Sequence, residues 1–325
     1  MKKILTFVVI ILLFAQPVIS QEKHKPVVVT SLPSIASIIR EALGDSVEII
    51  YLVPPGVEPH QYQLSPDQIA LLRKADVIVT TGHLPAEMKV LELKKSGEIP
   101  GVVLSIEDYE RYGFRYLPER WYTGKNNPHG IWLDPRNALA IAEATGDALV
   151  ELHPELKDVI RNNLRRFEDK INVVIESYSG ILAGKKAIIE LPSQQYTLEW
   201  LGIEVVDSIK PEAEVPAKSV DSITPSADVV VYDEATPQTL KDASRKLSER
   251  LGIPLANVTI LWVKENYSTV LIENTKSIIK AMSEKGGVVV KTESSDVAKY
   301  SIISLIVGIV VGVSIGIVIK RCPVL

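Results

Sequence analysis

The feature that most constrains this chain is a repeated alternation of short apolar runs with segments of helical period. Valine- and isoleucine-rich runs, which predict buried strands, occur at 25–30, 47–53, 77–81 and 102–105, and again at 185–191, 203–209, 227–234 and 257–263. Strands that alternate with helices along a chain predict mostly parallel sheets. We therefore predict an α/β fold made of two small lobes.

A long segment free of helix breakers separates the two groups of strands. Asp134-Pro135 starts a helix that is expected to run to about Leu152. From Pro154 to Leu182, apolar residues keep a helical period, which predicts one helix of about 28 residues and roughly 42 Å. The predicted boundaries are an N-terminal lobe at 25–152, a connecting helix at 153–183 and a C-terminal lobe at 184–290.

The first twenty residues, MKKILTFVVIILLFAQPVIS, predict a secretory signal peptide at 1–20. Two lysines precede an apolar run, and Val18 and Ser20 are small enough for a cleavage site. The alternative is an uncleaved anchor, but the apolar run is short for a spanning helix, which needs roughly 20 residues.

The opposite end of the chain predicts a membrane helix. Residues 301–319 carry no charge, and the segment is long enough to cross a bilayer. Lys320 and Arg321 follow at once, which favours a cytoplasmic C-terminus and a body outside the cell membrane. Residues 291–300 then form a short polar stalk.

Three glycines of this segment, Gly308, Gly312 and Gly316, recur at every fourth position. Small residues at that spacing allow a close contact with another membrane helix. The alternative is that glycine is simply frequent in spanning helices.

The composition of the body excludes two other classes of protein. The only cysteine, Cys322, lies beyond the predicted membrane helix, so the exported body holds no disulfide. The formal net charge is −4, and no basic stripe with interleaved aromatic residues occurs, so we expect no nucleic-acid partner.

Candidate ligand residues lie where the predicted strands end, and open parallel sheets bind ligands at that edge. His60 and His83 follow the strands at 47–53 and 77–81. The others are His129, in the loop before the helix at Asp134, and the strand-end carboxylates Glu190, Asp233 and Glu234. Imidazole and carboxylate together suit zinc or manganese. We predict a metal between the lobes, although His83 could instead cap the next helix and the carboxylates could be solvated.

Two segments resemble the substrate-binding proteins of ABC transporters that import zinc and manganese, the cluster A-I type. GVEPHQYQLSP (56–66) resembles the family's G-x-[DE]-P-H-x-Y-x-x-[ST]-P motif, and NPHGIWLDPRNA (127–138) resembles its D-P-H-x-W-x-D-P-x-N-A motif. Glu87 matches a glutamate that follows the next strand, and the similarity continues into YTLEWLGIEV (196–205). The resemblance implies two lobes on a rigid helix with the metal at their interface.

The same resemblance assigns only part of the metal site. It places the first metal histidine on His60 and the second on His129. The third position falls on Leu191, which cannot bind a metal, and Glu190 is one residue away. The fourth falls near Leu261 or Trp262, where no carboxylate matches. We therefore consider His83 as the third ligand and Glu234 or Asp233 as the fourth, with Glu190 as a further candidate for the third position.

The sequence thus favours an extracytoplasmic binding protein that is not an enzyme. It would capture a divalent metal, zinc in preference to manganese, and deliver it to an ABC permease in the membrane. One alternative is an exported metal-dependent hydrolase that uses an open ligand position. Another is a relative that has switched to a non-metal solute.

Overall fold

A computed structural model describes residues 25–212 and 215–286 of the 325-residue chain. The predicted signal peptide, stalk and membrane helix, with its glycines at 308, 312 and 316, lie outside the described residues. No helix in the described ranges combines the length and the apolar character that crossing a bilayer requires.

The first sheet has four parallel strands in the order β2-β1-β3-β4. Its strands are β1 (Val27–Thr30), β2 (Glu48–Tyr51), β3 (Val77–Val79) and β4 (Val102–Leu104). All three residues of β3 are buried, as expected for a strand covered on both faces. The four strands predicted for this lobe are confirmed, with shorter bounds.

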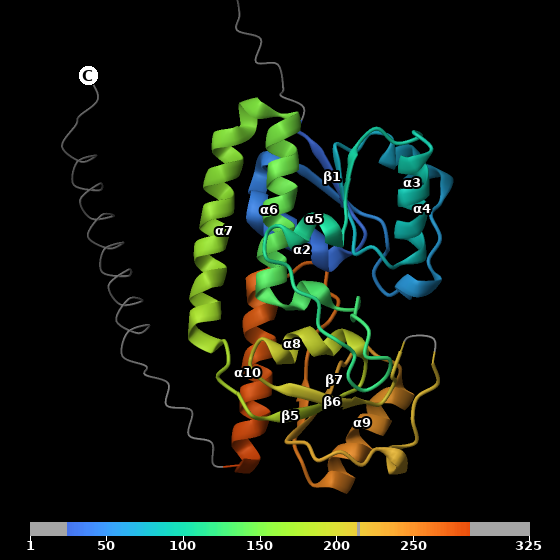
Figure 1. Cartoon of the computed structure of the whole chain (residues 1–325), viewed down its shortest axis with the longest axis vertical. Coiled ribbons are helices and arrows are strands. Elements are labelled where there is room, and N and C mark those ends of the chain that lie inside the picture. The colour runs from blue at the N-terminus through green and yellow to red at the C-terminus, as the bar shows by residue number, and fades with distance from the viewer. Residues whose placement is uncertain (1–24, 213–214, 287–325) are drawn as a thin grey trace, which may run out of the picture. The chain divides into compact units, whose positions relative to one another are not determined.

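The second sheet repeats this plan, with the order β6-β5-β7-β8 and parallel pairing throughout (Figure 1). Its strands are β5 (Lys186–Ile189), β6 (Glu204–Ser208), β7 (Val229–Tyr232) and β8 (Leu255–Asn257). The α/β fold with two lobes of parallel sheets is therefore confirmed.

The prediction of a strand at 257–263 was wrong, because β8 ends at Asn257. Beyond it, side chains rather than a neighbouring strand bind the backbone. The amide of Ile260 donates to Asp233 Oδ2 at 3.0 Å, and the amide of Trp262 donates to Ser34 Oγ at 3.2 Å. Two of the apolar residues that suggested a strand, Ile260 and Trp262, are instead buried against the N-terminal half, where they bind Trp132 and Ser34.

Helices and short 3₁₀ turns connect the strands. Those of the N-terminal half are α2 (Pro33–Leu43), η1 (Gly44–Ser46), η2 (Pro59–Gln61), α3 (Pro66–Leu72), α4 (Pro85–Lys95), α5 (Ile106–Glu110), η3 (Ile131–Leu133) and α6 (Pro135–Leu152). Those of the C-terminal half are η4 (Pro154–Leu156), α7 (Lys157–Tyr178), η5 (Pro192–Gln194), α8 (Gln195–Glu199), η6 (Val220–Ser222), α9 (Gln238–Leu251) and α10 (Tyr267–Gly286). Ser65 and Gln68 form a capping box at the start of α3.

The connecting helix is shorter than predicted. It comprises the 22 residues of α7, because the turn after Pro154 is 3₁₀ and the helix ends at Tyr178. Ser179 leaves the helical conformation with ψ 124°, and Gly180 has φ 70°. In Figure 1, α7 runs beside α6, and in sequence it links the two sheets.

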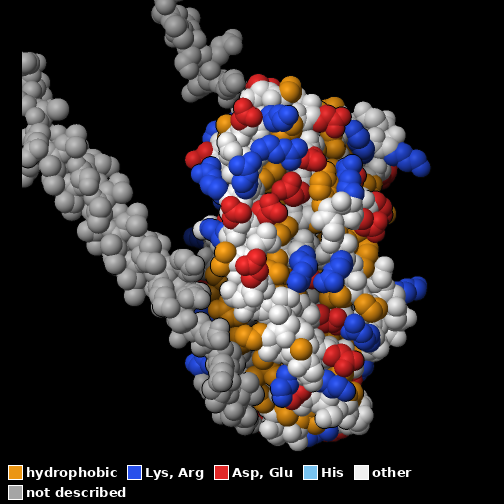
Figure 2. Space-filling model, turned by 60° about the vertical axis from the view of Figure 1, so that its left-hand side comes forward, with side chains coloured by type: hydrophobic (Ala, Val, Ile, Leu, Met, Phe, Trp, Pro, Cys, Tyr) orange, Lys and Arg blue, Asp and Glu red, His pale blue; other side chains and the backbone are white. Residues whose placement is uncertain are grey.

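Tryptophans bind the two halves of the body together. The indole of Trp132, in η3, donates to the carbonyl of Ile260 at 3.1 Å, and the indole of Trp262 donates to Ser37 Oγ at 2.8 Å. Both side chains are buried, so these hydrogen bonds form away from water. Over the face shown in Figure 2, Lys and Arg side chains lie among Asp and Glu side chains.

Candidate metal centre

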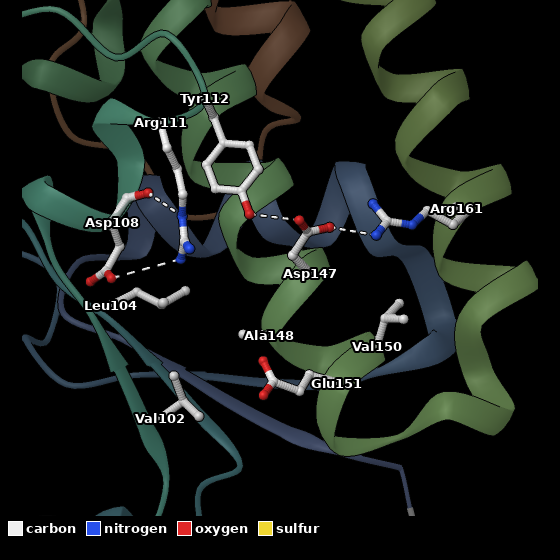
Figure 3. A pocket seen from close by; sticks show the side chains of 10 residues that line it. All are labelled: Val102, Leu104, Asp108, Arg111, Tyr112, Asp147, Ala148, Val150, Glu151 and Arg161. Carbon is white, nitrogen blue, oxygen red and sulfur yellow. Dashed lines mark hydrogen bonds and ion pairs between the residues drawn. The ribbon is translucent and has the colours of Figure 1, made fainter.

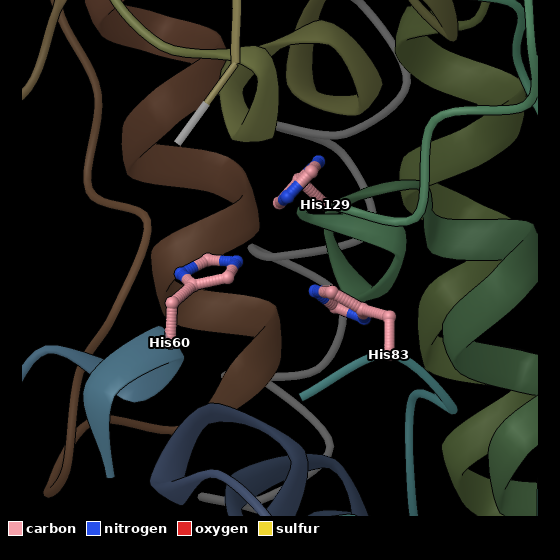
Figure 4. A group of neighbouring side chains, drawn as sticks. All are labelled: His60, His83 and His129. Atoms are coloured by element: carbon pink, nitrogen blue, oxygen red, sulfur yellow. The ribbon is translucent and has the colours of Figure 1, made fainter. Parts of the chain in front are cut away.

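Three histidines that are distant in sequence converge on one point (Figure 4). The ring centroids of His60 and His129 are 5.3 Å apart, those of His60 and His83 5.7 Å, and those of His83 and His129 5.0 Å. One nitrogen from each ring lies within 4.8 Å of the other two. Small movements of the side chains would therefore bring all three nitrogens onto one metal ion, since zinc binds imidazole at about 2.1 Å.

Short structures at the strand ends hold the first two histidines. His60 lies in η2, where the Glu58 side chain caps the turn by accepting the His60 amide at 3.3 Å. His83 follows β3, and Gly82 turns the chain there with φ 79°. A side chain is strained at that φ, so glycine suits this turn.

A buried carboxylate fixes the orientation of His83. Glu87 has no exposed surface, and its carboxylate accepts the backbone amides of His83 and Leu84 at the start of α4, both at 3.0 Å. The Thr81 hydroxyl donates to the same carboxylate at 2.8 Å, so the oxygen of Thr81 accepts the Nδ1 proton of His83, also at 2.8 Å. The glutamate caps this helix, and the Nε2 atom of His83 keeps its lone pair.

The other two histidines carry their proton on the same nitrogen. Nδ1 of His60 is 2.8 Å from the carboxylate of Glu58, which can only accept. Nδ1 of His129 is 2.9 Å from the Asn127 side-chain oxygen. The Asn127 amide nitrogen donates to Pro192 O and Gln195 Oε1, so its oxygen is the acceptor. All three Nε2 atoms are therefore free to accept a proton or a metal, as in oriented metal-binding histidines.

Burial keeps two of these imidazoles neutral. Burial, together with the smaller effects of His83 and His60, lowers the pKa of His129 to about 3. Burial is also the main cause that lowers the pKa of His83, against an opposing effect of the Glu87 charge. Neutral imidazole is the form that binds a metal.

The Nε2 atom of His60 gives a second indication of a ligand. It is buried and has no hydrogen-bond partner within the described part of the chain. A buried polar atom without a partner costs free energy, of the order of 1–3 kcal/mol. A metal ion at the centre of the three rings would remove that cost.

His129 lies on a segment of the N-terminal half that is bound to the second lobe. We call residues 115–130 the strap. The Tyr196 hydroxyl donates to the carbonyl of Asn127 at 2.7 Å and accepts the amide of Leu117 at 3.1 Å. Gln195 Nε2 donates to the carbonyl of Pro118 at 3.0 Å, and Arg120 forms an ion pair with Glu199. These contacts hold the segment that carries His129 against the second lobe.

The last residue of the strap makes a close contact. Gly130 has φ 71°, and a Cβ placed on it would lie 2.0 Å from the carbonyl oxygen of Ser193. Only glycine allows the backbone next to His129 to approach η5 this closely.

Two carboxylates near His129 were not among the residues that the sequence suggested. Nε2 of His129 is 3.2 Å from Glu212 Oε1, and Glu119, His129 and Glu212 each place a ligand atom within 4.8 Å of the others. Burial raises the pKa of Glu119, and the charge of Glu212 raises it further. Glu212 follows β6, so the strand-end rule that selected Glu190 could also have found it.

The structure does not bring Glu190 or Glu234 into the histidine group. Glu190 is buried, and its carboxylate accepts the Asp233 amide and the Thr236 hydroxyl, each at 3.0 Å, and the Ser244 hydroxyl. Burial raises its pKa to about 7. Glu234 is exposed and pairs with Lys241 at 3.1 Å. Glu190 therefore holds the turn between β7 and α9, and Glu234 forms an ion pair at the surface.

A separate cavity of about 350 Å³ lies beside β4, α5, α6 and α7 (Figure 3). Three of its polar side chains, Tyr112, Asp147 and Arg161, pair with each other. The Tyr112 hydroxyl donates to Asp147 at 2.6 Å, and Arg161 is 2.6 Å from the other oxygen of Asp147. None of the three histidines lines it. We therefore assign no ligand to this cavity.

Comparison with known proteins places this chain in a family of metal-uptake proteins. Residues 28–281 match the family model for ZnuA, "Zinc-uptake complex component A periplasmic". The match covers most of the chain, so the protein belongs to this family. This match confirms the resemblance to the metal-binding proteins of ABC transporters that the sequence motifs indicated.

Individual relatives are distant in sequence. The chain is 23% identical over 298 residues to the zinc-binding lipoprotein AdcA of Streptococcus pneumoniae, covering 83% of this chain and 58% of AdcA. It is 27% identical over 180 residues to the manganese ABC transporter substrate-binding lipoprotein PsaA of the same species, covering 52% and 56%. It thus spans little more than half of these relatives. A crystal structure of ZnuA superposes with a TM-score of 0.63 at 22% identity, over 80% of this chain and 100% of that one.

Proposed function

We propose that this protein is an extracytoplasmic solute-binding protein that captures a divalent transition-metal ion with His60, His83 and His129. The observation that supports this most is the shared tautomer of the three rings. Each Nδ1 donates to a fixed acceptor, so each Nε2 lone pair is available at one point. The buried Nε2 of His60 lacks a partner among the described residues, which also favours an ion as cargo.

We propose zinc in preference to manganese. Three neutral imidazoles are borderline ligands that suit zinc, whereas manganese favours harder oxygen donors. The relatives include one named for zinc and one named for manganese, so family membership supports either metal. The proposed preference for zinc therefore rests on the three imidazole donors of this chain.

We propose that the loaded protein delivers its ion to an ABC permease and does not catalyse a reaction. PsaA, a relative, is named as the substrate-binding lipoprotein of such a transporter. Both relatives are named lipoproteins, which fits a tethered protein outside the membrane. In this chain the apolar segment 301–319 would provide the tether.

Thermal unfolding of the full-length chain in zinc, in manganese and in a chelator tests this function. An ion that binds only the folded state at about 100 times its Kd stabilises by about 2.7 kcal/mol. We expect a rise in Tm with zinc, a smaller one with manganese, and little rise for a variant with all three histidines changed to alanine. A wild-type Tm that is the same with either metal and with chelator would contradict the proposal.

A further inference from the structure

We infer that Glu212 is the fourth ligand of the bound ion and that the indole of Trp121 positions it. This inference rests on the proposed function, because it concerns the same ion. The family resemblance places two ligand positions at Leu191 and near Trp262, and neither side chain can bind a metal. Glu212 would supply a ligand that these positions lack.

The first argument is the contact between Glu212 and His129. Glu212 Oε1 lies 3.2 Å from Nε2 of His129. The proton of this ring is on Nδ1, where Asn127 accepts it, so the lone pair of Nε2 faces a carboxylate oxygen. Two acceptors at this distance repel each other unless a proton or a cation lies between them. A cation bound to both atoms removes the repulsion.

The distance itself suits a shared ion. Two ligands that each lie about 2.1 Å from a tetrahedral zinc ion are separated by about 3.4 Å. The 3.2 Å between Nε2 of His129 and Oε1 of Glu212 is close to that value. Both side chains are mostly buried, with 11% and 26% of their surfaces exposed, so the ion would be shielded from water.

The strap places both residues on the second lobe. The indole nitrogen of Trp121 donates to the carbonyl of Pro211 at 3.1 Å, next to Glu212 in the chain. Trp121 and His129 lie on the same strap, so one segment holds both second-lobe ligands. His60 and His83 come from the strand ends of the first lobe. The ion would thus join two ligands from each lobe.

Glu119 is a weaker candidate for this role. Its carboxylate accepts the Thr123 hydroxyl at 3.0 Å, its amide donates to the carbonyl of Lys125, and only 3% of the residue is exposed. One oxygen of its carboxylate lies within 4.8 Å of the ligand atoms of His129 and Glu212. We assign it to orienting Glu212, as carboxylates often do for metal ligands.

A carboxylate as fourth ligand has a consequence for metal choice. It is the only hard anionic donor in the set, and manganese depends on such donors more than zinc does. Removing it should therefore weaken manganese binding more than zinc binding. A residue that only stabilised the fold would weaken both equally.

The experiment is a competition titration of the full-length chain with zinc and with manganese. It compares wild type with Glu212→Gln, which keeps the size, with Glu212→Asp, which keeps the charge, and with Trp121→Phe, which removes the indole donor. Glu234→Gln is the matched control, because Glu234 is an exposed carboxylate outside the histidine group. Circular dichroism verifies that each variant is folded.

For Glu212→Gln we expect the zinc Kd to rise about tenfold and the manganese Kd about 100-fold, so that the preference for zinc increases. Glu212→Asp should keep a preference close to wild type. Trp121→Phe should weaken both metals less than Glu212→Gln does, and the control should behave as wild type. An unchanged preference in Glu212→Gln would overturn the assignment of Glu212. Wild-type protein that binds neither metal would instead refute the proposed function.

Discussion

The rings of His60 and His129 lie with their centroids 5.3 Å apart, although His60 follows a strand of the first lobe and His129 is bound to the second. The strap makes this possible, because it carries a residue of the N-terminal half onto η5 and α8. An ion between the two rings would therefore contribute directly to holding the lobes together.

Each of the three histidines should be needed for zinc binding. His60→Ala, His83→Ala and His129→Ala each remove one Nε2 donor, and we expect the zinc Kd to rise by more than about 100-fold, beyond the effect of losing an orienting group. Isothermal titration calorimetry with zinc measures the Kd of each variant. His153→Ala is the control, because that ring pairs with Asp76 away from the group. Zinc binding by His83→Ala at wild-type strength would remove His83 from the site.

Glu58 should tune affinity without supporting the fold. Glu58→Ala removes the acceptor for Nδ1 of His60, and loss of such a partner reduces metal affinity about 10- to 100-fold. Because 57% of its side chain is exposed, we expect little change in the Tm of the metal-free protein. Glu98→Ala, another surface carboxylate, is the matched control. Equal zinc affinities for the two variants would contradict an orienting role for Glu58.

Gly130→Ala should disturb the strap and the site together. The added Cβ would lie 2.0 Å from Ser193 O, and φ 71° is unfavourable for alanine. Strain of this kind costs about 1–3 kcal/mol, to which the clash with backbone adds. Urea unfolding should show this loss, and zinc affinity should fall because His129 shifts. Gly97→Ala, which has a similar φ of 78° but open space around it, isolates the effect of the clash.

Stability should depend on pH through Glu190. Its pKa is raised from an ordinary value of 4.5 to about 7 in the folded protein, so folding favours the protonated form. This contribution is complete below pH 4.5 and is lost as the pH rises through 7, on the order of 3 kcal/mol.

The matched variant for this prediction is Glu190→Gln. Its amide can keep the bonds to the Asp233 amide and to the hydroxyls of Thr236 and Ser244, since hydroxyls also accept. Urea unfolding of metal-free protein at several pH values should show a shallower decline between pH 4.5 and 7 than wild type shows. Parallel curves for the two proteins would mean that Glu190 does not titrate in this range.

Much of the fold follows from local patterns. Apolar runs and turn residues predict seven of the eight strands, and the alternation with helices predicts their parallel pairing. The misassigned strand at 257–263 shows where local pattern fails. Val258, Ile260 and Trp262 are buried, and the partners of the Ile260 and Trp262 amides, Asp233 and Ser34, are tertiary contacts that periodicity does not reveal.

The candidate site was predictable only in part for a similar reason. Position at strand ends selects His60 and His83, and a motif selects His129. The same rule also selects Glu190 and Glu234, but it cannot tell that one binds Thr236 inside the lobe and the other pairs with Lys241 at the surface. Its place after β6 would also select Glu212, but its position beside His129 depends on the contact between the strap and the second lobe, which no short motif encodes.

Anomalous X-ray diffraction at the zinc edge from crystals grown with zinc tests the central claim most directly. We predict one zinc peak at about 2.1 Å from the Nε2 atoms of His60, His83 and His129 together. A zinc peak bound elsewhere, or a structure in which any of these three nitrogens points away from the metal, would contradict the account.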